Sequence, residues 1–236
     1  MSDNQRRRPR AILLDAFGTL LELEPPAPAL RERLRERLGV ALSRREAEQA
    51  MAAEIAYYRA HLNEGRDRAS LVDLRRRCAV ALRDALPDGR SLPLAGVGDA
   101  LMGSLRFRPY PDAPPALDEL RALGLRLIVV SNWDVSLPAR LGDAGLLHRV
   151  HGVITSAELG GVQKPQPAIF AHALTLAGVP PELALHVGDS PSEDVSGARA
   201  AGIEPLLLVR QRVPAARPRR RVRTITSLLE LPALAA

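Results

Sequence analysis

The sequence predicts an α/β fold, in which a doubly wound parallel sheet carries an inserted helical domain. Short apolar runs that end in polar residues alternate with helical stretches closed by glycine, as expected for buried parallel strands covered by helices. A block of consecutive helical patterns interrupts this alternation between the first and second runs. We therefore divide the chain into a sheet domain, residues 1–22 and 105–236, and a helical domain, residues 23–104.

Five apolar runs are expected to be strands. They are continuous rather than alternating, which is typical of strands buried on both faces. In chain order they span residues 11–15, 125–132, 152–156, 183–190 and 205–209. Helices are expected at residues 113–124 and 168–178, because each stretch has a helical apolar pattern and closes on a glycine.

Three helical patterns follow one another in the inserted domain. They span residues 29–39, 43–62 and 70–87, and no convincing strand lies among them. Their arginine-rich faces are typical of solvated helix surfaces. A lobe of this kind that closes over the edge of a sheet would exclude water and supply substrate-selecting side chains.

Composition and charge limit the classes of partner. The net charge is +6, but residues 1–10 and 210–223 carry +3 and +7, so the rest of the chain is acidic by four charges. Short basic tails on an acidic body are typical of solvated flanks, and an aromatic content of 3% offers little for base stacking, so we expect no nucleic-acid partner. The single cysteine, Cys78, suits a reducing cytoplasm. We expect no secretory signal and no membrane association, since no apolar run is long enough to cross a bilayer.

Polar residues stand where the predicted strands end. Asp15 follows the first strand, Ser131 and Asn132 close the second, and Asp189 closes a later one. In open α/β sheets, ligands bind at the carboxyl ends of the strands. Of the 33 basic residues, 32 are arginine, and the only lysine is Lys164, which precedes a predicted helix. A lysine ammonium is a compact charge that fits between closely spaced anions.

These residue types suggest anion chemistry. Asp15 and Asp189 at neighbouring strand ends would repel each other unless a cation neutralised them, and Mg²⁺ prefers such oxygen ligands. The alternative for Asp189 is a turn or helix-capping carboxylate. The Ser131 hydroxyl and the backbone N–H groups after it can cradle an oxyanion, while Lys164 would damp its repulsion from Asp15. An attacking carboxylate would then form an aspartyl-phosphate, which water hydrolyses.

The motifs DAFGTL, SNWD, QKPQP and GDSPSED, in this order, resemble those of the haloacid dehalogenase-like hydrolase superfamily, with its Rossmann-like core and helical cap. The resemblance implies that Asp15 is the nucleophile. It also implies that Mg²⁺ is held by Asp15, the backbone carbonyl of Phe17 and Asp189, and that Asp194 helps to hold Lys164 or a metal-bound water. The implied substrate-binding residues are Thr19, Ser131, Asn132 and Lys164.

Phe17 departs from the phosphatase pattern. Phosphatases of this superfamily usually carry a second aspartate here, a general acid whose contribution is about 10²- to 10⁴-fold in rate. An aromatic at this position resembles the metal-independent 2-haloacid dehalogenases, with their D-A-Y-G-T-L, whereas the acidic GDSPSED motif resembles the phosphatases. The combination with SNWD is similar to a less characterised subgroup of the superfamily. Asp134 or His186 could replace the missing acid, unless Asp134 is a helix cap and His186 a packed strand residue.

Three interpretations follow. The leading one is a Mg²⁺-dependent phosphatase acting on a small phosphorylated metabolite with a good leaving group, such as an acyl or aryl phosphate. The second is a metal-independent 2-haloacid dehalogenase that uses the same nucleophile. The third is a catalytically weak binding or interaction protein, in which Phe17 marks the loss of activity.

Overall fold

The computed structural model describes residues 8–210 and 222–235, and the chain divides into two compact units. One unit comprises Met1–Glu22 with Pro109–Ala236, and the other comprises Leu23–Arg108. Most of the basic tail expected at 210–223 lies outside the described residues, as do residues 1–7. Arg210 is described, and it is partly buried rather than fully solvated.

The first unit is built on a six-stranded sheet in which all the strands are parallel. The spatial order is β5-β4-β1-β6-β7-β8, which places the first strand near the middle. The strands are β1 (Ala11–Leu14), β4 (Arg126–Ser131), β5 (Gly152–Thr155), β6 (Ala184–Gly188), β7 (Glu204–Leu208) and β8 (Arg223–Ile225). The predicted α/β fold is confirmed, and five of these strands fall where apolar runs predicted them.

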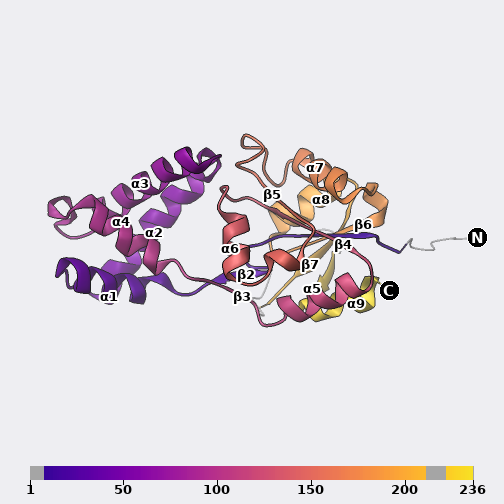
Figure 1. Ribbon diagram of the computed structural model, residues 1–236, viewed down its shortest axis with the longest axis horizontal. Coiled ribbons are helices and arrows are strands. Elements are labelled where there is room, and N and C mark those ends of the chain that lie inside the picture. The colour runs from indigo at the N-terminus through magenta and orange to yellow at the C-terminus, as the bar shows by residue number, and fades with distance from the viewer. Residues whose placement is uncertain (1–7, 211–221, 236) are drawn as a thin grey trace, which may run out of the picture. The chain divides into compact units, whose positions relative to one another are not determined.

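Helices cover both faces of this sheet. Helices α7 (Pro167–Ala177) and α8 (Ser196–Ala200) lie on one face, and α5 (Ala113–Ala122) and α9 (Leu231–Ala235) lie on the other (Figure 1). Alternate residues of the central strands therefore enter different cores; Leu13 and Ile128, for example, pack with Phe170 of α7. A further helix, α6 (Leu137–Asp143), follows β4.

The second unit contains four α-helices among the described residues: α1 (Pro26–Leu38), α2 (Arg44–His61), α3 (Arg68–Asp84) and α4 (Leu94–Ser104). The sequence predicted the first three but not α4, because glycine has a low helix propensity. In α4 the missing side chains make room for α1. A Cβ at Gly96 would lie 2.7 Å from Leu38, and one at Gly103 would lie 2.6 Å from the guanidinium of Arg33.

Two short strands mark where the chain crosses between the units. β2 (Leu21–Leu23) pairs with β3 (Phe107–Pro109) in a separate two-stranded sheet. The sequence predicts that the sheet domain resumes at residue 105, directly after α4, whereas the contacts extend the helical unit to Arg108. The difference arises because β3 is only three residues long and carries no distinctive pattern.

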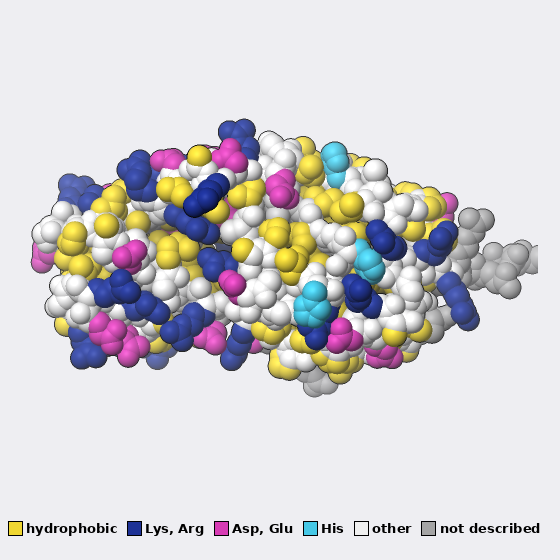
Figure 2. All heavy atoms as spheres, in the orientation of Figure 1, with side chains coloured by type: hydrophobic (Ala, Val, Ile, Leu, Met, Phe, Trp, Pro, Cys, Tyr) yellow, Lys and Arg dark blue, Asp and Glu magenta, His cyan; other side chains and the backbone are white. Residues whose placement is uncertain are grey.

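Arginines of the helical unit pair with acids on the surface. Arg44 lies 2.6 Å from Glu48, and Arg77 lies 2.8 Å from Asp73. In the view of Figure 2, basic and acidic side chains intermingle rather than gather into one patch. None of the helices that the structure describes is both long and apolar enough to span a membrane.

Candidate active site

The register of the sheet brings three strand ends together. Leu14, the last residue of β1, pairs with Val129 of β4 on one side and with Val187 of β6 on the other. The next residue, Asp15, continues β1 by donating its backbone N–H to the carbonyl of Val187 (2.9 Å). Asp15 therefore emerges at the same edge as Ser131 and the turn after β6.

Lys164 lies between two carboxylates. Its Nζ is 2.6 Å from Oδ1 of Asp15 and 2.6 Å from Oδ1 of Asp194, and all three side chains are buried. The Ser131 hydroxyl donates to the same Oδ1 of Asp15 at 3.1 Å. The sequence thus identified a set of residues that the fold places in direct contact.

Burial and charge act against each other in this cluster. Burial raises the pKa of Asp15 to about 6, although the Lys164 ammonium opposes the increase. Burial would lower the pKa of Lys164, but the charges of Asp15 and Asp194 outweigh it and raise that pKa above its ordinary value. For Asp194, burial acts to raise the pKa, yet the charge of Lys164 and the bond from His186 leave it below its ordinary value.

His186 supports Asp194 from inside the sheet. It is fully buried in β6, where its Nε2 lies 2.9 Å from Oδ1 of Asp194 and its ring meets the Phe170 ring edge-on at 4.9 Å. Because Asp194 is ionised, Nε2 carries the proton and donates it. The backbone N–H of Ser190 donates to the other oxygen of Asp194 at 3.0 Å. His186 is thus a packed strand residue, one of the two alternatives weighed from the sequence, and it also holds the partner of Lys164.

Asn132 contacts the backbone of Lys164. Its Oδ1 accepts from the Lys164 N–H at 2.8 Å, and its Nδ2 donates to the Lys164 carbonyl at 3.0 Å. The same Nδ2 lies 3.2 Å from a carboxylate oxygen of Glu193. The Lys164–Pro165 peptide bond that follows is cis. The family resemblance implies that Asn132 binds substrate, and no local feature of the sequence predicts its contact with Lys164.

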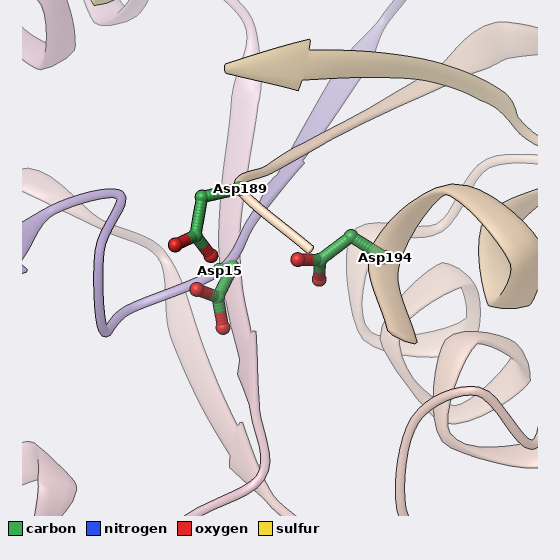
Figure 3. A group of neighbouring side chains, drawn as sticks. All are labelled: Asp15, Asp189 and Asp194. Carbon is green, nitrogen blue, oxygen red and sulfur yellow. The ribbon is translucent and has the colours of Figure 1, made fainter. Parts of the chain in front are cut away.

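Three carboxylates point toward one another at the edge of the sheet. Asp15, Asp189 and Asp194 each offer one oxygen, and these oxygens lie within 4.8 Å of one another (Figure 3). Asp189 is the exposed member. Partial removal from water and the charge of Asp194 both raise the pKa of Asp189. Three carboxylate oxygens this close together could hold a cation, because oxygen ligands suit hard metal ions.

Gly18 allows the loop after Asp15 to approach this cluster. Its φ of +81° is strained for residues with a side chain, and a Cβ would lie 2.2 Å from Oδ2 of Asp189. Thr19, the next residue, is fully buried, and its hydroxyl has no hydrogen-bond partner among the described residues. The glycine of DAFGTL is therefore required both by backbone conformation and by space.

The remaining predicted residues flank the site. Phe17 is 41% exposed, and its ring meets the buried Trp133 ring edge-on at a centroid distance of 6.3 Å. Asp134 is buried, and its Oδ1 accepts from the backbone N–H of Ser136 at 2.7 Å. This bond shapes the turn before α6, but the N-cap residue of α6 is Ser136, so Asp134 is a turn residue and not the helix cap.

Comparison with known proteins identifies the family. The model of the haloacid dehalogenase-like hydrolases matches residues 9–202, which is most of the chain. The chain belongs to the haloacid dehalogenase-like hydrolase family. The matched range contains the four motifs quoted from the sequence and, within them, Asp15, Lys164 and Asp189.

This haloacid dehalogenase-like hydrolase is similar to curated phosphatases over part of its length. It is 39% identical over 114 residues to glyceraldehyde 3-phosphate phosphatase of Methanopyrus kandleri, covering 48% of each chain. It is 43% identical over 99 residues to phosphoserine phosphatase of Thermus thermophilus, covering 42% of this chain and 39% of the relative. The matches thus span about half the length of these relatives or less.

Solved structures of this hydrolase family match along nearly the whole chain. A phosphatase from Thermococcus onnurineus superposes with a TM-score of 0.65 at 26% identity, covering 95% of this chain and 97% of the other. A 2-haloacid dehalogenase from Pseudomonas syringae superposes with a TM-score of 0.67 at 27% identity, covering 96% and 97%. The fold is thus shared by both chemistries, and the residues of the site must distinguish them.

Proposed function

We propose that the protein is a Mg²⁺-dependent phosphatase that acts on a small phosphorylated metabolite, with Asp15 as the nucleophile. The observation that carries the proposal is the contact of Asp15 with both Lys164 and Ser131, at 2.6 and 3.1 Å, beside the carboxylate of Asp189. Phosphoryl transfer depends on a positioned nucleophile and on fixed charges around the transferred group. The similarity to two curated phosphatases supports a phosphorylated substrate.

The reaction would proceed in two steps, formation of an aspartyl-phosphate and its hydrolysis. The Asp15 carboxylate attacks phosphorus, the bond from phosphorus to the leaving oxygen breaks, and the leaving group departs with the electron pair. Water then attacks the phosphorus of the aspartyl-phosphate, the bond from phosphorus to the Asp15 oxygen breaks and restores the carboxylate, and inorganic phosphate leaves while a proton from the water passes to solvent. Lys164 and the Ser131 hydroxyl would stabilise negative charge during both steps.

The residues at the site fit a divalent cation. Lys164 pairs with Asp15 and Asp194, and Asp189 adds a third carboxylate, so the cluster carries more negative charge than Lys164 balances. We assign Asp15, the backbone carbonyl of Phe17 and Asp189 as the groups that would hold Mg²⁺, which prefers oxygen ligands. Bound there, the ion would supply charge stabilisation for the phosphoryl oxygens.

Phe17 directs the proposal to substrates with good leaving groups. An aromatic ring cannot protonate a departing alkoxide, but aryl oxides and carboxylates depart without a proton. The exposed ring of Phe17, packed edge-on against Trp133, would also offer an apolar contact for an aryl group. Aryl and acyl phosphates are therefore the substrate classes we favour.

A second candidate is a metal-independent 2-haloacid dehalogenase. Phe17 favours it, because displacement of halide needs no general acid, and a dehalogenase is among the structural neighbours. Asp189 disfavours it, since this carboxylate beside Asp15 would repel a carboxylate substrate. Release of chloride from 2-chloropropionate in the presence of EDTA would identify this activity.

The test is a phosphate-release assay on alkyl, aryl and acyl phosphates with Mg²⁺ or with EDTA. We expect turnover only with Mg²⁺, a steep increase as the leaving-group pKa falls, and its loss in both Asp15→Asn and Asp189→Asn. Asp118→Asn is the matched control, because Asp118 pairs with Arg149 in the same unit and takes no part in the cluster. Absence of both phosphate and halide release from the folded protein would favour a binding protein instead.

A further inference from the structure

Arg210 is the first residue of the basic segment that the sequence analysis treated as a solvated flank. In the structure it lies two residues beyond the carboxyl end of β7, and its side chain is only 16% exposed. An arginine that is charged and largely buried must have its donors satisfied. Its partners lie in two segments that are distant in the sequence.

The first segment is the loop after Asp15. Arg210 Nη2 donates to the carbonyl of Thr19 at 2.6 Å, and its Nε donates to the carbonyl of Gly18 at 3.3 Å. Within this loop, the carbonyl of Ala16 accepts from three successive N–H groups, those of residues 19–21. Arg210 thus binds the carbonyls of Gly18 and Thr19, which the bonds to Ala16 within the turn leave free.

The second segment begins where the chain returns from the helical unit. Arg210 Nη1 lies 3.1 Å from Oδ2 of Asp112, and the guanidinium carbon lies 3.6 Å from the centre of the Tyr110 ring. Asp112 is itself held, because its Oδ2 also accepts from the Ser227 hydroxyl at 2.8 Å and from the Leu228 N–H at 2.9 Å. The loop after Asp15 is thereby tied to a fixed carboxylate.

Only a guanidinium can make this set of contacts. Its planar fork directs donors to two carbonyls and a carboxylate at once, while its face stacks on an aromatic ring. A lysine ammonium in this position would retain the charge and lose the fork. The two kinds of cation thus have different positions: Lys164 lies between the carboxylates of Asp15 and Asp194, whereas Arg210 binds the backbone of the loop after Asp15.

We propose that Arg210 is a positioning residue for the candidate active site. It holds the Gly18–Thr19 turn in the conformation that places Gly18 against the Asp189 carboxylate. This inference rests on the proposed function for its catalytic consequence. The structural part, the holding of the turn, stands on the contacts alone.

The experiment compares Arg210→Lys and Arg210→Ala with wild type. We expect the kcat for an aryl phosphate to fall by about 10- to 100-fold in both variants, the effect of a displaced site, with a smaller change in KM. Methylguanidinium should restore part of the lost kcat to Arg210→Ala, whereas methylammonium at the same concentration should not. Arg149→Lys is the control. Arg149 also contacts a carboxylate and a backbone carbonyl in this unit, those of Asp118 and Gly145, but it does not contact the loop after Asp15.

Hydrogen exchange separates this inference from the proposed function. Backbone amides of residues 16–21 should exchange faster in Arg210→Lys than in wild type, whether or not the protein is a phosphatase. Unchanged exchange in this turn, or wild-type kcat in Arg210→Lys, would overturn the inference. Faster exchange without phosphatase activity in wild type would retain the positioning role and reject the proposed chemistry.

Discussion

The side chain of Asn132 binds both the backbone N–H and the backbone carbonyl of Lys164. The side-chain oxygen accepts from the Lys164 N–H at 2.8 Å, and the side-chain amide donates to the Lys164 carbonyl at 3.0 Å. Asparagine can make both contacts because it carries a donor and an acceptor, whereas an ionised aspartate carries only acceptors. The buried ammonium of Lys164 is therefore aimed from its own main chain as well as by the carboxylates around it.

Replacement of Asn132 should disturb catalysis more than stability. We expect Asn132→Ala to reduce kcat by about 10- to 100-fold, because small displacements of a charged group at a reacting centre have effects of this size. Steady-state kinetics with an aryl phosphate provide the measurement. Glu193→Gln serves as the control, since it keeps an oxygen for the third contact of Asn132. Wild-type kcat in Asn132→Ala would show that Lys164 is held adequately without this contact.

Loss of the His186 donor should destabilise the sheet unit. His186→Leu removes a buried donor from the ionised Asp194, and leaving such a group short of a partner costs about 1–3 kcal/mol. His186→Gln, which can still donate to Asp194, should lose less. Urea denaturation measures both. Exposed His172 on α7 provides the control as His172→Leu, and equal stability of His186→Leu and this control would contradict the expectation.

Gly18 and Gly124 form a matched pair for testing the space beside Asp189. Both have φ near +80°, but a Cβ at Gly124 meets nothing within 4 Å, whereas one at Gly18 meets the Asp189 carboxylate. Each alanine variant should lose about 1–3 kcal/mol of stability through backbone strain. Only Gly18→Ala should also lose phosphate release. If the two variants are equally active, the close approach to Asp189 has no catalytic importance.

Glu54 should make stability fall with increasing pH. It is buried in the helical unit beside Cys78, and burial raises its pKa to about 7 although the thiol hydrogen bond opposes this. The folded state then binds the proton more tightly than the unfolded state, whose pKa is near 4.5. The contribution of Glu54 to the free energy of unfolding is fully present below pH 4.5 and is lost progressively as the pH rises through 7, by roughly 3 kcal/mol in total.

The variant that tests this is Glu54→Gln, which cannot ionise. Its unfolding free energy should depend less on pH between 5 and 8 than that of wild type and should exceed the wild-type value at pH 8. Exposed Glu48, paired with Arg44 on the same helix, gives the control Glu48→Gln. Parallel pH profiles for wild type and Glu54→Gln would mean that Glu54 is ionised at little cost.

The fold was readable to different degrees in different elements. Continuous apolar runs predicted five of the strands, because a strand buried on both faces has to be apolar along its length. The sixth, β8, is short and includes polar Arg223 and Thr224, so no run marks it. Helix α4 was missed because its glycines are favourable only where α1 packs against them, and tertiary packing of that kind has no local signature.

The candidate site shows a similar limit. The sequence singled out Asp15, Ser131 and Asp189 because polar residues at parallel strand ends share one edge, and Lys164 because it is the only lysine; the structure brings all four together. It did not predict the contacts that orient them. The bonds of Asn132 to the Lys164 backbone and of Arg210 to the loop after Asp15 join residues far apart in the chain, and nothing in their local sequence distinguishes them.

The partners of Asp15 come from remote parts of the chain, since Ser131 lies 116 residues and Lys164 149 residues away. No fragment that contains β1 alone, or β1 with the helical unit, can assemble the site. Turnover therefore reports on the docking of β1, β4 and β6 and of the segment that carries Lys164, and it should recover no earlier than the last of these to dock during refolding. In a protein with a single tryptophan, enzymatic activity would add a second probe of that step.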